Sequence, residues 1–321
     1  MEKIKVGVVG VGYFGRFHAE KYSKIPYVEL VGVADIDGSR ARDVAGRFST
    51  QPFLDYRNLF DKVQAVSVAV PTSVHYQVAR DFIDHGIDVL LEKPMTTSLR
   101  EAEALVERAQ AQKRILQIGH LERFNSVLAA LDGLVGDPLF LDSQRLSPFL
   151  ERTADVDVVL DLMIHDIDIV LSIIPGEVTG IDAVGVPVVS PRLDVANARL
   201  VFESGCAANM TASRVSREKL RQITVFQKDG YFTIDFLSHV IRVNRKKEGS
   251  KGSEVVAEEI RIEPVDALEK EIRSFIEKVR DRTVPLVSGQ EGKRALRIAL
   301  AITEEIQKQI RKRKEPGFLD V

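Results

Sequence analysis

Residues 5–15, KVGVVGVGYFG, join an apolar run to three glycines in the spacing Gly10-x-Gly12-x-x-Gly15. The run predicts a β-strand, and the glycines open a predicted helix at about residues 13–23. Gly10 permits a tight turn, Gly12 lets the backbone approach a pyrophosphate, and Gly15 lets the helix pack closely on the strand. The first N–H groups of such a helix have no partner within it and attract phosphate. The stretch therefore predicts a Rossmann-type dinucleotide site.

Beyond this stretch, short β-branched runs alternate with longer helical patterns as far as residue 120. The runs predict strands at Lys5–Gly10, Val28–Asp35, Ala65–Val70, Val89–Glu92 and Ile115–Gly119. The patterns between them predict helices at about residues 13–23, 38–48, 73–85 and 98–112. Such alternation is typical of a parallel sheet covered by helices on both faces. We therefore predict an α/β fold whose N-terminal domain, residues 1–120, is a Rossmann doubly wound parallel sheet.

The pattern changes after Gly119, and residues 121–321 are expected to form an α+β domain with a mainly antiparallel sheet. Helices are predicted at Leu121–Val135 and Val156–Ile174, with a strand at Leu139–Ser147 between them. Further strands are predicted between Val178 and Val243, including Ala198–Phe202, Cys206–Ser213, Gln222–Gln227, Gly230–Asp235 and Val240–Val243. The polar stretch Arg245–Glu254 predicts a loop. Two helices are predicted at about 265–280 and 289–313, and the last is a candidate to pack back on the first domain.

Composition excludes several classes of protein. The 321 residues carry 47 acidic and 45 basic side chains, so the net charge of −2 gives no electrostatic footprint for nucleic acid or an anionic membrane. An apolar fraction of 45% suffices for two cores, and no apolar run approaches the ~18 residues of a membrane span. The one cysteine, Cys206, cannot form an intramolecular disulfide or a cysteine-based zinc site. We therefore expect a cytoplasmic protein without a secretory signal.

Asp35 ends the second predicted strand, 20 residues after Gly15 (35 − 15). An acid at this place hydrogen-bonds the hydroxyls of a ribose and repels a 2′-phosphate. Ile36 follows it, where an arginine or serine would be expected beside a 2′-phosphate. NAD is therefore favoured over NADP, although Arg40 and Arg42 lie close enough in sequence to keep NADP open. The competing interpretation is a glycine turn that holds no dinucleotide.

Glu92-Lys93-Pro94 ends the fourth predicted strand, at the edge of the sheet where ligands bind. A lysine there can stabilise the alkoxide-like charge of a hydride-transfer transition state. Taken alone the triplet is a loop in most proteins, and its position after this strand is what gives it weight. Whether the Lys93–Pro94 bond is cis or trans cannot be read from the sequence.

The predicted helix Val156–Ile174 is apolar nearly all round, which indicates burial. Asp157, Asp161, His165, Asp168 and Ser172 nevertheless recur at every third or fourth residue, which places them in one polar stripe. His165 suits proton transfer near neutral pH, and Asp161 can orient it. The alternative is a buried histidine satisfied by a helix neighbour. A metal site on Asp161, His165 and Asp168 is a weaker interpretation, because no second His/Cys cluster is evident.

Other candidates lie after predicted strands. His75 ends Pro71-Thr72-Ser73-Val74-His75, and His120 and Arg123 follow the last strand of the first domain; a helix cap or an interface role stays open for both histidines. The predicted cofactor residues are Gly10, Gly12, Tyr13, Phe14, Gly15, Asp35, Ile36, Pro71, Thr72, His75, Glu92 and Lys93. The predicted catalytic residues are Lys93, Asp161 and His165, and the predicted substrate residues are Lys93, His120, Arg123, Asp161 and His165. No metal is predicted.

Together these motifs resemble the Gfo/Idh/MocA oxidoreductase family. The likeness rests on the glycine fingerprint, Asp35, Pro71–His75, Glu92-Lys93-Pro94, Gly119–Asn125 and Asp161-x-x-x-His165-x-x-Asp168, and so covers nearly the whole chain. The family implies NAD(P)-dependent chemistry on sugars and polyols, and a second domain whose open sheet faces a partner subunit. Lys93, Asp161 and His165 match its catalytic residues, and Glu92 matches the acid near the nicotinamide ribose. Met163 and Ser126 depart from the family pattern, and Met163 adds bulk where substrate contacts are expected.

The resemblance is strongest to the branch that oxidises the 3-hydroxyl of UDP-N-acetylglucosamine-type sugars. Arg123 and Arg145 could face a pyrophosphate or a carboxylate, and the alternative is a structural role, which is usual for arginines at a domain junction. His165 is then the expected base and Lys93 the stabiliser of the oxyanion, and the two could exchange roles. The alternatives are an inositol or other polyol dehydrogenase, a reductase of linear tetrapyrroles, and a non-catalytic dinucleotide sensor. The expected partners are a sugar or nucleotide sugar and sister subunits in a homodimer or homotetramer, with no nucleic acid and no membrane.

Overall fold

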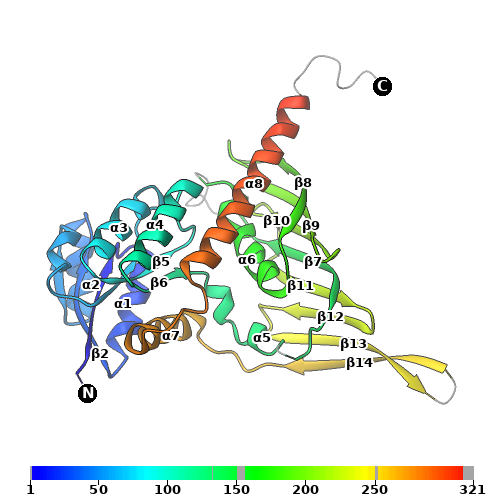
Figure 1. The fold of residues 1–321 in the computed structure, drawn as a ribbon, viewed down its shortest axis with the longest axis horizontal. Coiled ribbons are helices and arrows are strands. Elements are labelled where there is room, and N and C mark those ends of the chain that lie inside the picture. The colour runs from blue at the N-terminus through cyan, green and yellow to red at the C-terminus, as the bar shows by residue number, and fades with distance from the viewer. Residues whose placement is uncertain (1, 132, 150–155, 250–251, 314–321) are drawn as a thin grey trace. The chain divides into compact units, whose positions relative to one another are not determined.

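The structure is a computed structural model that describes residues 2–131, 133–149, 156–249 and 252–313 (Figure 1). It divides into two compact units. The first unit comprises residues 1–124 and 266–296, and the second comprises residues 125–265 and 297–321. The expected division at residue 120 therefore differs in one respect, because residues 266–296 return to the first unit.

The first unit contains a six-stranded parallel sheet in the order β3-β2-β1-β4-β5-β6. Its strands are β1 (Ile4–Val9), β2 (Val28–Ala34), β3 (Gln51–Phe53), β4 (Ala65–Val68), β5 (Asp88–Glu92) and β6 (Leu116–Gly119). This confirms the predicted Rossmann-type sheet. The short edge strand β3 was not predicted, because its three residues include a proline and carry no periodic pattern.

The helices of the first unit follow the predicted ranges closely. They are α1 (Gly15–Ser23), α2 (Gly38–Arg47), α3 (His75–Asp84) and α4 (Leu99–Ala111), with the 3-10 turns η1 (Tyr56–Leu59) and η2 (Thr72–Val74). Local capping fixes where they begin: the Asp37 side chain accepts the amides of Ser39 and Arg40, and the Ser98 hydroxyl accepts the amide of Glu101. In the first unit α3 packs beside α4 and α1 beside α7 (Ala267–Asp281) (Figure 1).

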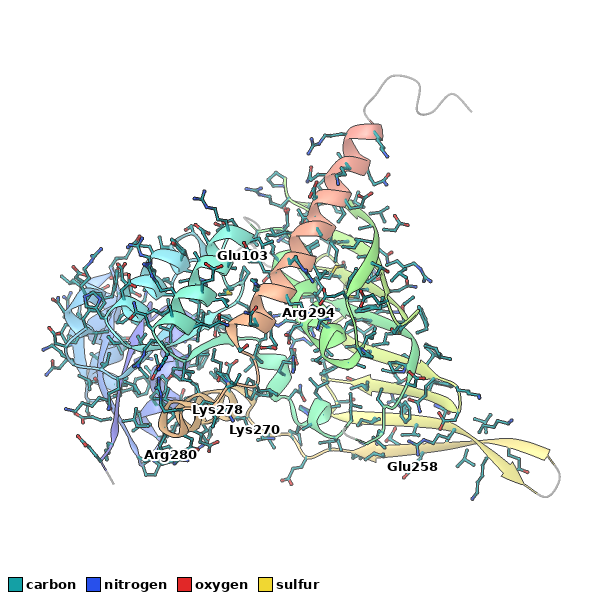
Figure 2. All side chains as sticks on the ribbon, in the orientation of Figure 1. Glu103, Glu258, Lys270, Lys278, Arg280 and Arg294 are labelled. Carbon is teal, nitrogen blue, oxygen red and sulfur yellow. The ribbon has the colours of Figure 1, made fainter. Side chains whose placement is uncertain are left out.

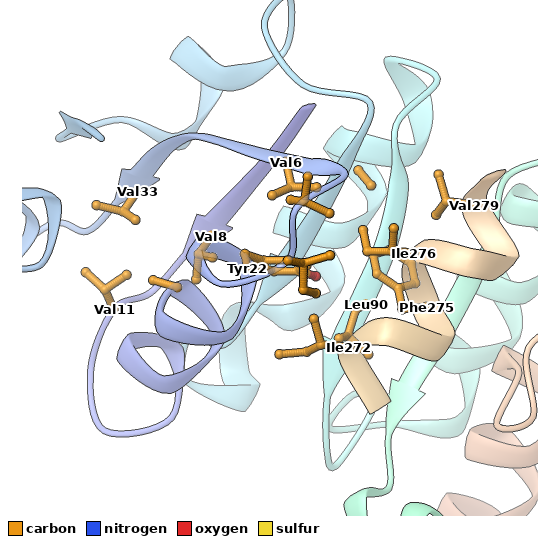
Figure 3. Close-up of a cluster of buried hydrophobic side chains, with 14 of the residues drawn as sticks. Val6, Val8, Val11, Tyr22, Val33, Leu90, Ile272, Phe275, Ile276 and Val279 are labelled. Atoms are coloured by element: carbon orange, nitrogen blue, oxygen red, sulfur yellow. The ribbon is translucent and has the colours of Figure 1, made fainter. Parts of the chain in front are cut away.

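The apolar face of α7 explains why this helix belongs to the first unit. Ile272, Phe275 and Ile276 are fully buried and join a core that includes Val6 on β1 and Tyr22 on α1 (Figure 3). Lys270, Lys278 and Arg280, which Figure 2 labels, are partly or fully exposed on the same helix. Burying a helix stripe of this kind stabilises the unit through removal of apolar surface from water, at about 25 cal/mol per Å².

The second unit contains an eight-stranded sheet in the order β14-β13-β12-β11-β7-β10-β9-β8. Its strands are β7 (Pro138–Leu146), β8 (Val178–Val186), β9 (Val195–Phe202), β10 (Ala207–Ser213), β11 (Leu220–Gln227), β12 (Gly230–Asp235), β13 (Val240–Gly249) and β14 (Gly252–Arg261). The pairs are antiparallel except for β7 with β10. This confirms the predicted mainly antiparallel sheet.

Two predictions for the second part of the chain are wrong. Leu121–Val135 is not one helix: it contains the 3-10 turn η3 (Leu121–Phe124) and the short helix α5 (Ser126–Ala129), which Asn125 separates by capping the amide of Val127 with its side chain. Arg245–Glu254 is not a loop, because the described residues of this stretch extend β13 and β14, which pair from Val240 with Arg261 to Gly249 with Gly252. The polar composition predicted a loop, but the pairing of basic β13 with acidic β14 across the two strands forms a sheet instead.

The last helix, α8 (Gly289–Arg313), contributes to both units along its length. Near its start, Gly292 fits closely against Ile118 of the first unit, where an added Cβ would lie 2.5 Å from the Ile118 side chain. Further along, Ile306 packs against Gly185 of the second unit. Over the described residues, no helix combines the length and the apolar character that a membrane span requires.

Candidate functional site

A cleft of about 750 Å³ opens at the carboxyl ends of β1, β2, β4 and β5 in the first unit. In an open α/β sheet this edge is where ligands bind. Of the predicted cofactor residues, Gly10, Gly12, Tyr13, Phe14, Asp35, Ile36, Pro71, Glu92 and Lys93 line the cleft. Gly15, Thr72 and His75 do not line it. The sequence motifs thus converge on one cavity, although they lie up to 83 residues apart (93 − 10).

The glycine turn has the shape that a dinucleotide requires. Gly10 adopts φ +80°, and an added Cβ would lie 2.7 Å from the Ala69 carbonyl oxygen. A Cβ on Gly15 would lie 1.8 Å from the Gly10 carbonyl oxygen, so this position admits glycine alone. Gly12 has no atom within 4 Å of its Cβ position, which leaves room for a pyrophosphate at the start of α1. These residues fit NAD.

Asp35 is held in place by three sets of donors. Its carboxylate accepts the amides of Val11 and Asp37, both at 2.9 Å. Arg40 adds contacts from its guanidinium at 3.2 and 3.3 Å, and it also pairs with Asp37 at 3.4 Å. Arg40, one of the two arginines that kept NADP open in the sequence, is therefore engaged with acidic residues. Ile36, which is 96% exposed, offers an apolar surface beside Asp35.

Several cleft residues were not predicted as cofactor residues. They are Arg40, Leu54, Tyr56, Arg57, Ser73, Val74 and Gln77, together with apolar residues at strand ends. Leu54, Tyr56 and Arg57 follow β3, the strand that sequence periodicity missed. A turn signal was present, because Asp55 caps η1 by accepting the amide of Arg57, but it carries no information about the cleft without the strand before it.

Lys93 follows β5 and is partly exposed in the cleft, and its peptide bond to Pro94 is cis. Buried His120 lies behind this region at the end of β6. Burial, together with the Lys93 and Arg123 charges, lowers the pKa of His120 to about 3. His120 is therefore neutral at physiological pH. Lys93 and Arg123 are the two cations that act on it, so three of the predicted substrate residues cluster within the first unit.

His75 does not line the cleft but contacts backbone carbonyls of two segments that do. Its ring is buried, with Nδ1 2.9 Å from the Pro94 carbonyl oxygen and Nε2 2.8 Å from the Val70 carbonyl oxygen. Burial lowers the pKa of His75, while the contacts with the Val70 and Pro94 carbonyls act to raise it. The ring links the chain after β4 to the chain after Lys93, and its direct contact with a cofactor stays an untested prediction.

Glu92 ends a row of buried polar groups that the sequence did not indicate. His18 on α1 lies between Glu92 and Ser67: its Nε2 is 3.0 Å from Glu92 Oε1 and its Nδ1 is 3.0 Å from Ser67 Oγ. Ser67 Oγ is also 2.8 Å from the Tyr22 hydroxyl. Gly119 makes room for this arrangement, because a Cβ there would lie 3.1 Å from the Glu92 carboxyl group.

Glu271 on α7 is a further residue that sequence reasoning missed. Its carboxyl group, the His18 ring and the Glu92 carboxyl group offer atoms that all lie within 4.8 Å of one another, and over the described residues this is the group of His and acidic side chains close enough to hold a cation. A signal was present: Glu271 falls within the apolar spacing Leu268, Ile272, Phe275, Ile276, where a charged residue is out of place.

Asp161 and His165 lie in the second unit, on a helix that is not regular. The predicted helix Val156–Ile174 consists of the π-helical turn η5 (Val159–Met163) and then α6 (Ile164–Ile173). Single π-turns occur often at functional sites, where they change which way side chains face. Asp161 lies within η5 and His165 is the second residue of α6, and both side chains are partly exposed.

The polar stripe predicted on this helix is wrong at its first residue, Asp157. Asp157 lies before the helix and accepts the amide of Leu193 at 3.0 Å, and exposed Ser172 donates to the Ile169 carbonyl at 2.7 Å. Both side chains therefore hydrogen-bond to groups of the backbone. Arg145 is likewise engaged, because its guanidinium donates to buried Asp166 at 2.8 to 3.1 Å. The expectation that Arg145 faces a pyrophosphate is therefore wrong, since the arginine is buried in an ion pair.

Comparison with known proteins identifies two family domains. The model described as "Oxidoreductase family, NAD-binding Rossmann fold" matches residues 4–120, and that of the "GFO/IDH/MocA C-terminal domain" matches residues 113–233. UDP-N-acetylglucosamine 3-dehydrogenase from Acidithiobacillus ferrooxidans is 36% identical over 96% of this chain and 98% of its own. A solved structure of that enzyme covers 96% of this chain and 99% of its own with a TM-score of 0.90. The scyllo-inositol 2-dehydrogenase (NAD(+)) of Bacillus subtilis is 27% identical over 95% of this chain and 94% of its own.

Proposed function

The chain belongs to the Gfo/Idh/MocA family of NAD-binding oxidoreductases, and on that premise we propose that it oxidises the 3-hydroxyl of a UDP-N-acetylglucosamine-type sugar. The observation that carries the proposal is the likeness to UDP-N-acetylglucosamine 3-dehydrogenase, which extends over nearly the whole of both chains at a TM-score of 0.90. It includes the second unit, which supplies Asp161 and His165.

The residues of both units divide the chemistry between them. The cleft residues would hold NAD, which would supply the acceptor for the hydride of the substrate C–H bond. His165 takes the hydroxyl proton as general base, and Asp161 orients its ring. The ammonium group of Lys93 stabilises the charge that develops on the oxygen. The charges of Lys93 and Arg123 both act on neutral His120, and this supports the proposal that His120 and Arg123 bind the substrate.

The test is turnover of UDP-N-acetylglucosamine, followed by the absorbance of NADH. Lys93→Ala and His165→Ala should each lower kcat by about 10²–10⁴-fold, the size expected for loss of a group that moves or stabilises a proton. Lys62→Ala, which removes an exposed lysine of the same unit, is the control and should leave kcat unchanged. Near-normal turnover by both variants would exclude the assigned roles.

A polyol is the second candidate substrate, because inositol dehydrogenases also match this chain over nearly its full length. The same assay with scyllo- and myo-inositol in place of the nucleotide sugar separates the two. A value of kcat/KM for an inositol above that for UDP-N-acetylglucosamine would transfer the proposal to the polyol. No absorbance change with any sugar, polyol or nucleotide sugar would instead support a dinucleotide sensor.

We also propose that the chain forms a homodimer or homotetramer through the exposed face of its eight-stranded sheet. Val201, Phe226 and Tyr231 lie in one cross-strand row on this face and are 37 to 38% exposed. Phe226 also stacks on Phe140, with ring centroids 5.6 Å apart. Light scattering of the purified protein should give two or four times the monomer mass, and Phe226→Arg should lower it. A cytoplasmic location belongs to the same proposal and rests on the single cysteine.

A further inference from the structure

Behind Lys93 lies a row of hydrogen bonds that ends at Glu92. The Glu92 carboxylate can only accept, so His18 Nε2 must carry the hydrogen of their 3.0 Å bond. On the other side of the ring, His18 Nδ1 lies 3.0 Å from Ser67 Oγ, which in turn lies 2.8 Å from the Tyr22 hydroxyl. His18 is therefore a donor to Glu92 that Ser67 and Tyr22 hold in place.

Glu271 approaches Glu92 from α7. Its side chain is fully buried, and neither of its oxygens makes a hydrogen bond with any described residue. Its carboxyl group lies within 4.8 Å of both Glu92 and His18. The separation suits one bridging water, or a direct hydrogen bond after a small change of rotamer. On β6, Gln117 donates to the Glu271 backbone carbonyl at 3.2 Å and so holds this part of α7 in place.

Two carboxyl groups this close in a buried site cannot both be ionised. Burial and the Glu92 charge raise the pKa of Glu271 well above its usual range. Burial also acts to raise the pKa of Glu92, but the hydrogen bond and charge of His18 and the Lys93 charge outweigh it and lower that pKa. The pair therefore holds one proton and one negative charge, with the proton on Glu271 and the charge on Glu92.

We propose that Glu271, as a neutral acid, donates its proton towards Glu92 and is thereby the positioning residue for the carboxylate behind Lys93. A protonated carboxyl group at this separation can donate a charge-assisted hydrogen bond to the carboxylate through one bridging water, or directly after a small change of rotamer. It completes the set of donors on Glu92, which already accepts from His18 and, at 3.3 Å, from the Lys93 amide. One fixed negative charge then lies next to the ammonium group of Lys93.

Other ionisable groups of the first unit surround this pair. His18 and Tyr22 come from α1, and Glu92 and Lys93 come from the end of β5. η3, which packs against α7, carries Glu122 and Arg123, and His120 precedes it. Of these, Glu92 is the group whose charge acts on Glu271. The inference rests on the proposed function where it concerns Lys93, but the proton on Glu271 can be tested without any substrate.

The direct test is infrared spectroscopy of the full-length protein at neutral pH. A protonated buried carboxylic acid gives a C=O stretch that an ionised carboxylate lacks. We expect this band in the wild type and in Glu277→Gln, an exposed control on the same helix, and its loss in Glu271→Gln. A band that survives in Glu271→Gln would overturn the assignment. So would a divalent metal retained at one equivalent by the wild type and lost from Glu271→Gln, because a cation would then take the place of the proton.

The positioning role is tested by the pH profile of kcat with UDP-N-acetylglucosamine. Glu271→Leu removes the donor, so Glu92 protonates more readily and the acidic limb should move up by about one to two pH units. Glu271→Gln keeps a neutral donor and should restore the wild-type profile. An unchanged profile in Glu271→Leu would overturn the role.

A failure of the proposed function would look different. If no substrate turns over, the rate of chemical acylation of the Lys93 amine against pH, followed by peptide mass spectrometry, replaces kcat as the readout. Glu271→Leu should then shift the Lys93 profile and Glu271→Gln should not. Coincident profiles in all variants would overturn the inference, whatever the substrate is.

Discussion

Arg214 in the second unit and Glu271 in the first are both fully buried side chains of ionisable residues, yet their surroundings differ completely. The Arg214 guanidinium donates to Asp194 at 2.8 Å, to Ser190 Oγ at 2.9 Å and to the Val156 carbonyl. Asp194 in turn accepts the amides of Val188, Val189 and Ser190 at 2.6 to 2.8 Å. Glu271, by contrast, makes no hydrogen bond from its carboxyl group to any described residue.

The difference shows what each group does. A buried ion pair whose every atom is satisfied fixes a chain path, here the loop between β8 and β9. A buried carboxyl group that stands next to a second carboxyl group can remain only if it holds a proton. The second unit thus uses buried charge to hold its fold, as Arg145 does with Asp166, whereas the first unit uses it beside the residues proposed for chemistry.

The largest effect is expected from breaking the ion pair of the second unit. Asp194→Asn should lower the free energy of unfolding by about 3 to 5 kcal/mol, because Arg214 would be left as a buried charge without its counter-ion. Urea unfolding followed by circular dichroism measures the change. Asp229→Asn, at an exposed turn between β11 and β12, is the control and should change it by less than about 0.5 kcal/mol. A loss of similar size in both variants would show that the buried pair has no special role.

The sequence predicted the first unit far better than the second. In the first unit a strand, a glycine turn and an acid at a fixed distance describe one local structure, so Gly10, Asp35 and Lys93 could be assigned to one edge of a sheet before the structure was known. In the second unit, the π-turn at Val159–Met163 departs from the regular 3.6-residue period on which stripe arguments depend. The roles of Asp161 and His165 stay predictions from the pattern, and Asp157, which the pattern included in the helix, lies before it.

Long-range packing was the part that no local pattern could supply. The return of α7 to the first unit joins residues about 250 positions apart (271 − 18), and this alone brings Glu271 to His18 and Glu92. The pairing of Arg145 with Asp166 also depends on tertiary packing, because Arg145 lies on β7 and Asp166 on α6. In both cases the residue type indicated a buried charge, but only the tertiary structure shows whether the charge has a partner.

A smaller effect is expected at Asp35, where the first unit holds a charge at the rim of the cleft. Asp35→Ser should lower the ratio of kcat/KM for NAD to that for NADP by about 10- to 100-fold, because hydrogen bonds to a charged group are lost and the repulsion of a 2′-phosphate is relieved. Arg40, which now pairs with Asp35 at 3.2 Å, would also become available to such a phosphate. Asp43→Ser on α2 serves as the control, and an unchanged ratio in Asp35→Ser would remove Asp35 from cofactor selection.

The smallest effect is expected in the pH dependence of the free energy of unfolding, to which Glu271 and Asp194 should contribute with opposite signs. The pKa of Glu271 is raised in the folded protein above its ordinary value of 4.5, so the folded state holds more protons than the unfolded chain above that pH. Its contribution to stability is therefore complete below pH 4.5 and declines as the pH rises, by at most about 1.4 kcal/mol per pH unit.

Asp194 should show the opposite slope. Burial acts to raise its pKa, but the amides of Ser190 and Val189 and the Arg214 guanidinium hold it below its ordinary value of 3.8, so its contribution is present above that pH and is lost in acid. Urea unfolding between pH 5 and pH 8 should thus give a wild type that loses stability with rising pH and a Glu271→Gln variant that loses less. Parallel slopes of the free energy of unfolding against pH for the two proteins would mean that Glu271 is ionised in the folded state. The contrast drawn between Glu271 and the ion pair of the second unit would then be wrong.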